Sequence, residues 1–102
     1  KVERYSTMDE EGIVFGRPDQ IELDLIVRDG VVIAAEIKSS ISKAEVATFL
    51  RKIKVFEAKE GRSVTQKIII SPMVERRALE FAMESGLKVY GYPEEVDLSD
   101  LQ

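Results

Sequence analysis

The chain has 102 residues and a formal net charge of −4, which is enough length for one domain with one core and too little for two. Cysteine and histidine are both absent, and this excludes disulfides, thiolate and histidine metal sites, and histidine-dependent catalytic triads. No apolar run approaches the roughly 20 residues that a bilayer-spanning helix needs, so we expect no membrane association.

The first 20 residues carry a weak pattern, from which we expect a strand around residues 12–16 and a turn at residues 17–20. Residues 21–28 alternate in the manner of a strand, and residues 31–38 form a second strand that begins with β-branched residues. Asp29 and Gly30 lie between the two strands and predict a hairpin.

The length of this hairpin turn decides which side chains share a face of the sheet. A two-residue turn puts Asp24 and Glu36 on opposite faces. A three-residue loop, with Gly30 in a left-handed conformation, puts both on one face together with Glu22. A metal site shared by these carboxylates therefore predicts a loop of odd length or a bulge.

The clearest helix start is the capping box formed by Ser42 and Glu45, and Gly61 ends the helix that follows. The expected inward positions on this helix are Val46, Phe49, Leu50, Ile53 and Phe56. The expected outward positions are Thr48, Arg51, Val55 and Lys59.

Residues 67–70 predict a strand that is buried on both faces. Ser71 and Pro72 then predict the start of a second helix, which ends at Gly86 and is followed by a last strand at residues 87–90. Its expected inward positions are Val74, Ala78, Phe81 and Ala82.

Two strand–helix–strand crossovers imply parallel pairing beside the antiparallel hairpin. We therefore expect a single α/β domain over residues 1–92, with a mixed sheet and flanking helices. Residues 93–102 are expected to form an acidic C-terminal tail.

The triplet of Glu36, Ile37 and Lys38 is the strongest chemical signal, because side chains two apart on a strand point the same way. Carboxylates beside an amine at the rim of an apolar sheet are costly unless a cation or a reaction requires them. Asp24 and Glu36 are therefore candidate metal ligands, and Glu22 is a third. The alternatives are a solvent-facing polar edge for the carboxylates and a protective surface lysine for Lys38.

The order of these elements resembles the PD-(D/E)XK nuclease superfamily. Asp24 comes first, then Glu36-Ile37-Lys38 on the next strand, then Ser39-Ser40, an amphipathic helix and a buried strand. More narrowly, residues 12–90 look like an archaeal group of uncharacterised nuclease-like proteins that carry an N-terminal helical or coiled-coil segment. The resemblance implies a restriction-endonuclease-like core.

Carried over residue by residue, the resemblance implies that Asp24, Glu36 and the backbone carbonyl of Ile37 bind Mg²⁺, with Mn²⁺ as an alternative. It implies that Lys38 orients or activates the attacking water. Two features of the superfamily lack a clear match. An acidic residue before the first strand has only Glu3 as a candidate, and the helix after the triplet contains no glutamine.

These observations predict a Mg²⁺-dependent nuclease domain that hydrolyses phosphodiester bonds of a DNA substrate. Lys43 and Lys52 are candidates for nucleic-acid contacts, although a solvated helix face accounts for them at least as well. The alternative function is a catalytically inactive nuclease-like fold that serves assembly or nucleic-acid docking.

Three broader expectations concern the source and setting of the protein. The absence of cysteine favours a cytoplasmic location, and the absence of asparagine fits a thermophilic organism. The chain begins with Lys1, so we expect that an upstream segment has been removed. Such a segment would provide one route to a homo-oligomer.

Overall fold

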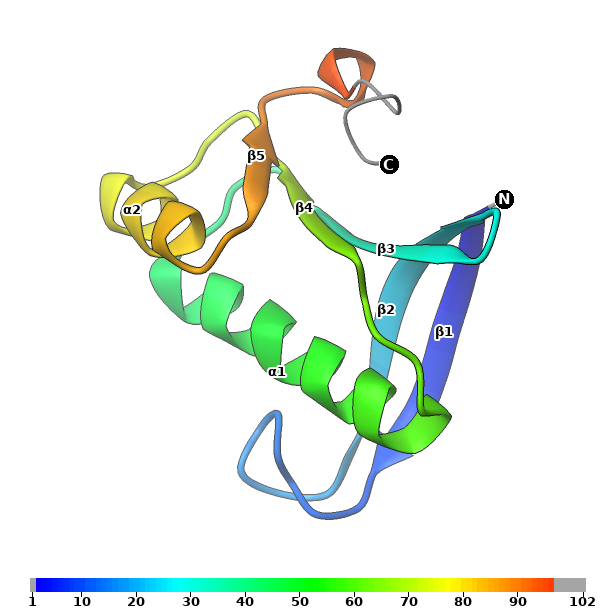
Figure 1. Cartoon of the computed structure of the whole chain (residues 1–102). Coiled ribbons are helices and arrows are strands. Elements are labelled where there is room, and N and C mark those ends of the chain that lie inside the picture. Colours follow the sequence, from blue (N-terminus) through cyan, green and yellow to red (C-terminus); the bar gives the residue numbers. More distant parts are fainter. Residues whose placement is uncertain (1, 97–102) are drawn as a thin grey trace.

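The computed structural model describes residues 2–96, which fold into one five-stranded sheet with both helices packed on the same face (Figure 1). The elements are β1 (Val2–Asp9), β2 (Asp19–Arg28), β3 (Val31–Ile37), α1 (Lys43–Glu60), β4 (Gln66–Ile70), α2 (Arg76–Glu84), β5 (Lys88–Tyr90) and the short 3₁₀ turn η1 (Pro93–Glu95).

The strand order is β1-β2-β3-β4-β5, with antiparallel pairing among the first three strands and parallel pairing among the last three. A mixed sheet with flanking helices is therefore confirmed. Within residues 2–96, no helix is long and apolar enough to cross a bilayer. The part of the expected acidic tail at 97–102 lies outside the described residues.

The strand predicted around residues 12–16 is wrong, because the first strand is β1 and residues 12–16 form a turn. Gly12 and Gly16 have φ angles of 69° and 79°, which no extended strand accommodates. A side chain at Gly12 would also place its Cβ 2.8 Å from the backbone nitrogen of Arg17. The turn therefore depends on glycine.

Helix α1 begins and ends where the sequence predicts. The Ser42 hydroxyl accepts a hydrogen bond from the Glu45 backbone N–H, and the Glu45 carboxylate accepts one from the Ser42 N–H. Gly61 closes the helix in a left-handed conformation. Val55 was expected on the outer face, yet it is buried against Val14 and Ile21, because the turn between β1 and β2 folds over that side of the helix.

Helix α2 begins at Arg76, four residues after the predicted start at Pro72. The intervening chain is extended, and Val74 pairs with Ile41 in an isolated parallel bridge. The Ser71 hydroxyl bonds to the backbone of Met73 instead of capping a helix. The expected inward positions within α2 are confirmed, because Ala78 and Ala82 are buried and Phe81 packs against the core.

The main core lies between the sheet and the two helices, and a smaller core covers the other face of β3 and β4. Strand alternation explains this division. Ala34 and Ile69 point to the helices, whereas Ala35 and Ile68 point to the opposite side. Because both faces of β3 and β4 are buried, any polar side chain on them has to lie at a strand end.

Candidate active site at the fork between β2 and β3

The β2–β3 hairpin has a two-residue turn, so the predicted odd-length loop or bulge is wrong. Arg28 pairs with Val31, and Asp24 pairs with Ala35. Asp29 and Gly30 have φ angles of 52° and 80°. Positive φ at both central positions is typical of the turn whose twist matches that of the flanking strands. In this register, strand alternation directs Asp24 and Glu36 toward opposite faces.

The two strands separate beyond the Asp24–Ala35 pair, and this separation forms the candidate site. From there, β2 continues back to Asp19 paired only with β1, while β3 continues to Ile37 paired with β4 (Figure 1). A polar hollow of about 160 Å³ lies in this fork, and we call it the fork hollow. It is bordered by Arg4, Glu22, Leu23, Asp24, Glu36, Ile37 and Lys52. Asp24 and Glu36 thus border the same hollow although they point toward opposite faces of the sheet.

Glu36 is a half-buried carboxylate of the fork hollow, as is Asp24. Burial raises the pKa of Glu36, and the negative charge of Asp24 adds to the increase. The ammonium groups of Lys52 and Lys38 oppose it, with Lys52 having the larger effect. The main cause of the raised pKa is therefore desolvation, not the repulsion among three carboxylates on one face that a longer hairpin loop would have produced.

Arg4 of β1 is a site residue that the sequence analysis missed. It lies directly opposite Asp24 in the β1–β2 pairing. Its Nε is 2.5 Å from Asp24 Oδ1, and its Nη1 is 3.3 Å from Glu22 Oε1. These carboxylates raise the pKa of Arg4, the hydrogen bond with Asp24 being the largest cause. Arg4 thereby neutralises the outer part of the fork hollow.

The three lysines singled out from the sequence lie in different places. Lys38 does not border the fork hollow, and its Nζ lies 3.1 Å from Glu45 Oε2 at the start of α1. Lys43 lies over the ring of Phe81, with its Nζ 5.5 Å from the ring centroid. Lys52 is the one of the three that borders the hollow.

A sequence model of the PD-(D/E)XK nuclease superfamily matches residues 19–88, which is more than half of the chain. The chain belongs to the PD-(D/E)XK nuclease superfamily. No curated protein and no solved structure matches it. The matched segment contains the whole β2–β3 hairpin and α1, and therefore every residue of the fork hollow except Arg4. Family membership supports a nuclease-like function for this domain.

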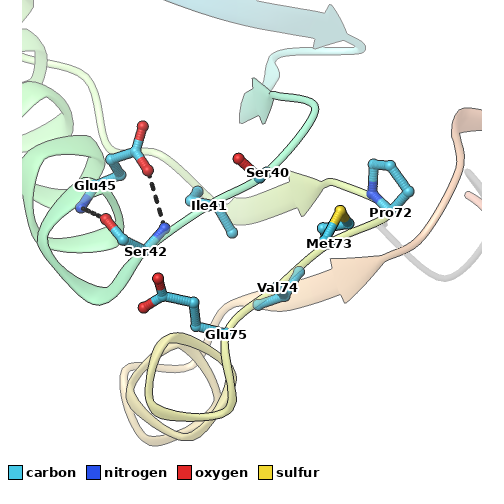
Figure 2. Close-up of a pocket in the computed structure, with 8 residues that line it drawn as sticks. All are labelled: Ser40, Ile41, Ser42, Glu45, Pro72, Met73, Val74 and Glu75. Atoms are coloured by element: carbon cyan, nitrogen blue, oxygen red, sulfur yellow. Dashed lines mark hydrogen bonds between the residues drawn. The ribbon is translucent and has the colours of Figure 1, made fainter.

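A larger cavity of this nuclease-like domain, about 480 Å³, lies beside the N-terminus of α1 (Figure 2). Its wall includes Glu45 and Glu75 with the apolar side chains of Ile41, Met73 and Val74, and among residues 2–96 no lysine or arginine lines it. Figure 2 shows Glu45 joined to Ser42 by the two capping hydrogen bonds. The Lys38 ammonium that pairs with Glu45 does not line this cavity, whereas two cationic side chains border the fork hollow, so the fork hollow is the better candidate for binding a phosphate.

The donor set of the fork hollow suits one Mg²⁺ ion held by few protein ligands. Within residues 2–96, no group of three or more acidic, histidine or cysteine residues is arranged to hold a metal. Asp24, Glu36 and Ile37 nevertheless border the same space, and Mg²⁺ commonly takes one or two carboxylates together with waters and substrate phosphate oxygens. Arg4 pairs with both Glu22 and Asp24, but Glu22 is exposed whereas Asp24 and Glu36 are half-buried, so Asp24 and Glu36 are the principal candidates.

Proposed function

We propose that this domain is a Mg²⁺-dependent nuclease that hydrolyses DNA phosphodiester bonds in the fork hollow. The observation that carries the proposal is the meeting of Asp24 and Glu36 at one polar hollow where the β2–β3 pairing ends. Family membership supports the same class of reaction. The oxygen-rich lining suits Mg²⁺, and Mn²⁺ is expected to replace it.

In this proposal, Asp24, Glu36 and the Ile37 carbonyl hold the cation. When bound, the cation supplies positive charge to the phosphate and makes water more acidic. Lys38 orients the attacking water after its ammonium leaves Glu45, to which it is joined in an exposed ion pair. Such pairs are worth no more than about 1 kcal/mol, so exchanging this partner costs little.

The reaction is a hydrolysis and needs no other reactant than water. The water oxygen forms a bond to phosphorus as the bond from phosphorus to the 3′ oxygen breaks. One proton of the water ends on the departing 3′ oxygen, and the phosphate remains on the 5′ side, as expected for this superfamily.

The test is a cleavage assay on single-stranded, duplex and branched DNA with Mg²⁺ or Mn²⁺, with metal binding followed by calorimetry. Asp24→Asn and Glu36→Gln should each lower cleavage on the order of 10²-fold or more and weaken metal binding. Asp29→Asn is the matched control, because residue 29 lies in the turn at the other end of the hairpin and asparagine tolerates its positive φ. Cleavage at the wild-type rate in both the Asp24→Asn and the Glu36→Gln variants would contradict the proposal.

A non-catalytic docking module is the second candidate, because Arg4 already forms ion pairs with Asp24 and Glu22. The ion pairs stabilise the carboxylates with no metal present, so the hollow is not obliged to bind one. The same assay separates the two functions. A docking module binds DNA equally well with and without Mg²⁺, cleaves none of the substrates, and gives no metal-binding signal that depends on Glu36.

A further inference from the structure

We propose that Lys52 of α1 is a further catalytic residue, whose ammonium group binds the scissile phosphate in the fork hollow. This inference rests on the proposed nuclease function and adds a second lysine to it. Two cationic side chains border the hollow within residues 2–96, Arg4 and Lys52. Arg4 is paired with Asp24 and Glu22, so Lys52 is the one of the two that can face a substrate without giving up an ion pair.

The two lysines near Glu36 differ in their own partners. The Lys38 ammonium is held by Glu45, outside the fork hollow. Lys52 borders the hollow, and no hydrogen bond or ion pair within residues 2–96 occupies its ammonium. Its charge acts on Glu36 across the hollow more strongly than that of Lys38. Lys52 is thus the lysine that borders the space in which a phosphate would lie.

The position of Lys52 is fixed by the helix that carries it. Its neighbour Ile53 is buried, as is Phe49 one turn earlier, so this part of α1 is anchored on the core. The side chain of Lys52 is half-buried, whereas Lys54 is exposed and borders a different hollow. Residues two apart on a helix diverge by about 200°, which explains the difference.

The chemistry requires a fixed positive charge at this position. Negative charge on the non-bridging phosphate oxygens has to be stabilised in the transition state, and a preorganised ammonium in a partly dehydrated hollow does so at little reorganisation cost. Lysine suits this role as a compact point charge for phosphate. Asp24, Glu36 and Lys52 border the same hollow, so a phosphate held beside a cation at the two carboxylates would have the Lys52 ammonium as a further positively charged partner.

The first experiment compares Lys52→Met with Lys54→Met in Mg²⁺-dependent cleavage under steady-state conditions. Lys52→Met should lower kcat by about 10²-fold with less than about a threefold change in KM, because the contact strengthens in the transition state. Lys54→Met should stay within about threefold of the wild type in both constants. Thermal unfolding of each variant reports on the fold. Equal kcat values for the two folded variants would overturn the proposal.

The absence of cysteine allows a sharper second test, because Lys52→Cys introduces the only thiol of this chain. Alkylation with 2-bromoethylamine rebuilds a lysine-like amine, and alkylation with iodoacetamide gives a neutral side chain of similar length. The amine adduct should be at least about tenfold faster than the neutral adduct, the signature of a required charge. Equal rates for the two adducts would show that Lys52 acts only through packing.

The outcomes also distinguish failure of this inference from failure of the proposed function. If the wild-type protein cleaves DNA and the Lys52→Met variant cleaves it as fast, the proposed role of Lys52 is wrong and the proposed nuclease function still stands. A wild-type protein that cleaves no DNA with Mg²⁺ or Mn²⁺ removes the nuclease function, and the role of Lys52 with it.

Discussion

Glu45 makes two contacts that substitution separates. Its Oε1 accepts a hydrogen bond of 2.9 Å from the Ser42 N–H, which completes the cap of α1, and its Oε2 lies 3.1 Å from Lys38 Nζ. Glu45→Gln keeps an oxygen that accepts the capping hydrogen bond but removes the charge. Glu45→Ala removes both contacts. The difference between the two variants therefore measures the cap alone.

The structure sets the expected size of each loss. The Lys38 and Glu45 side chains are 42% and 40% exposed, and an ion pair so exposed contributes about 0.5 kcal/mol. A capping contact contributes about 1 kcal/mol. Glu45→Gln should thus lower the free energy of unfolding by about 0.5 kcal/mol, and Glu45→Ala by about 1.5 kcal/mol. For a domain of about 100 residues, these losses correspond to roughly 2–4 °C and 6–12 °C in Tm.

The measurement is thermal and urea unfolding of both variants, followed by circular dichroism at neutral pH in low and high salt. High salt should remove the cost of Glu45→Gln, because an exposed ion pair is screened, and should leave most of the cost of Glu45→Ala. If Glu45→Gln in high salt remains as unstable as Glu45→Ala, the capping hydrogen bond does not supply the stability assigned to it.

The pH dependence gives an independent check on Glu45. The hydrogen bond from the Ser42 backbone is the largest cause that lowers the pKa of Glu45, and Lys38 lowers it further. A carboxylate with a lowered pKa stabilises the fold above its ordinary pKa and loses that contribution as the pH falls through its folded pKa. The stability difference between wild type and Glu45→Ala should therefore shrink in acid, and a constant difference would refute the assignment.

Three further predictions concern stability, each measured by urea unfolding. Burial raises the pKa of Glu36, so its charge destabilises the metal-free fold as the pH rises through that pKa. Glu36→Gln should therefore be more stable than the wild type at neutral pH and should lose this advantage in acid. A variant that is less stable than the wild type at neutral pH would contradict this prediction. Gly12→Ala should cost more than about 2 kcal/mol, since its Cβ meets backbone at 2.8 Å, whereas Gly16→Ala, with open space, should cost about 1–2 kcal/mol; equal costs would argue against the clash. Asp9→Ala should cost about 1–3 kcal/mol because the buried Val14 N–H loses its 2.8 Å acceptor, and Asp9→Asn, which retains an acceptor oxygen, should cost less.

Helix α1 and the hairpin were predictable because their signals are local. A capping box, a glycine in the left-handed conformation and an Asp-Gly turn act within a few residues of where they stand. The start of α2 failed for the opposite reason. Ser71 and Pro72 have the local chemistry of a helix start, but pairing of Val74 with Ile41, 33 positions earlier, keeps the segment extended.

The candidate site was predictable in its residue types but not in its geometry. Asp24 and Glu36 border the fork hollow. The number of residues in the hairpin turn could not be decided from the Asp-Gly pair, because the same pair fits two-residue and three-residue loops. Arg4 could not be found because β1 is an edge strand with mostly polar, exposed residues. Lys52 was named as a candidate from the sequence, but its half-burial and its place at the border of the fork hollow, which distinguish it from Lys54, are visible only in the structure.

Two cationic side chains hold α1 to the chain segments around β1 and thereby limit its sliding along the sheet. Arg51 Nε donates to the Val14 carbonyl at 2.9 Å, and Lys59 Nζ donates to the Met8 carbonyl at 2.6 Å. Apolar packing alone is non-directional and tolerates small axial shifts, whereas these two anchors fix a longitudinal position. Removing these two hydrogen bonds should therefore let α1 shift along its axis, and Lys52 with it, without unfolding the helix. Faster amide hydrogen exchange along α1 would report this mobility.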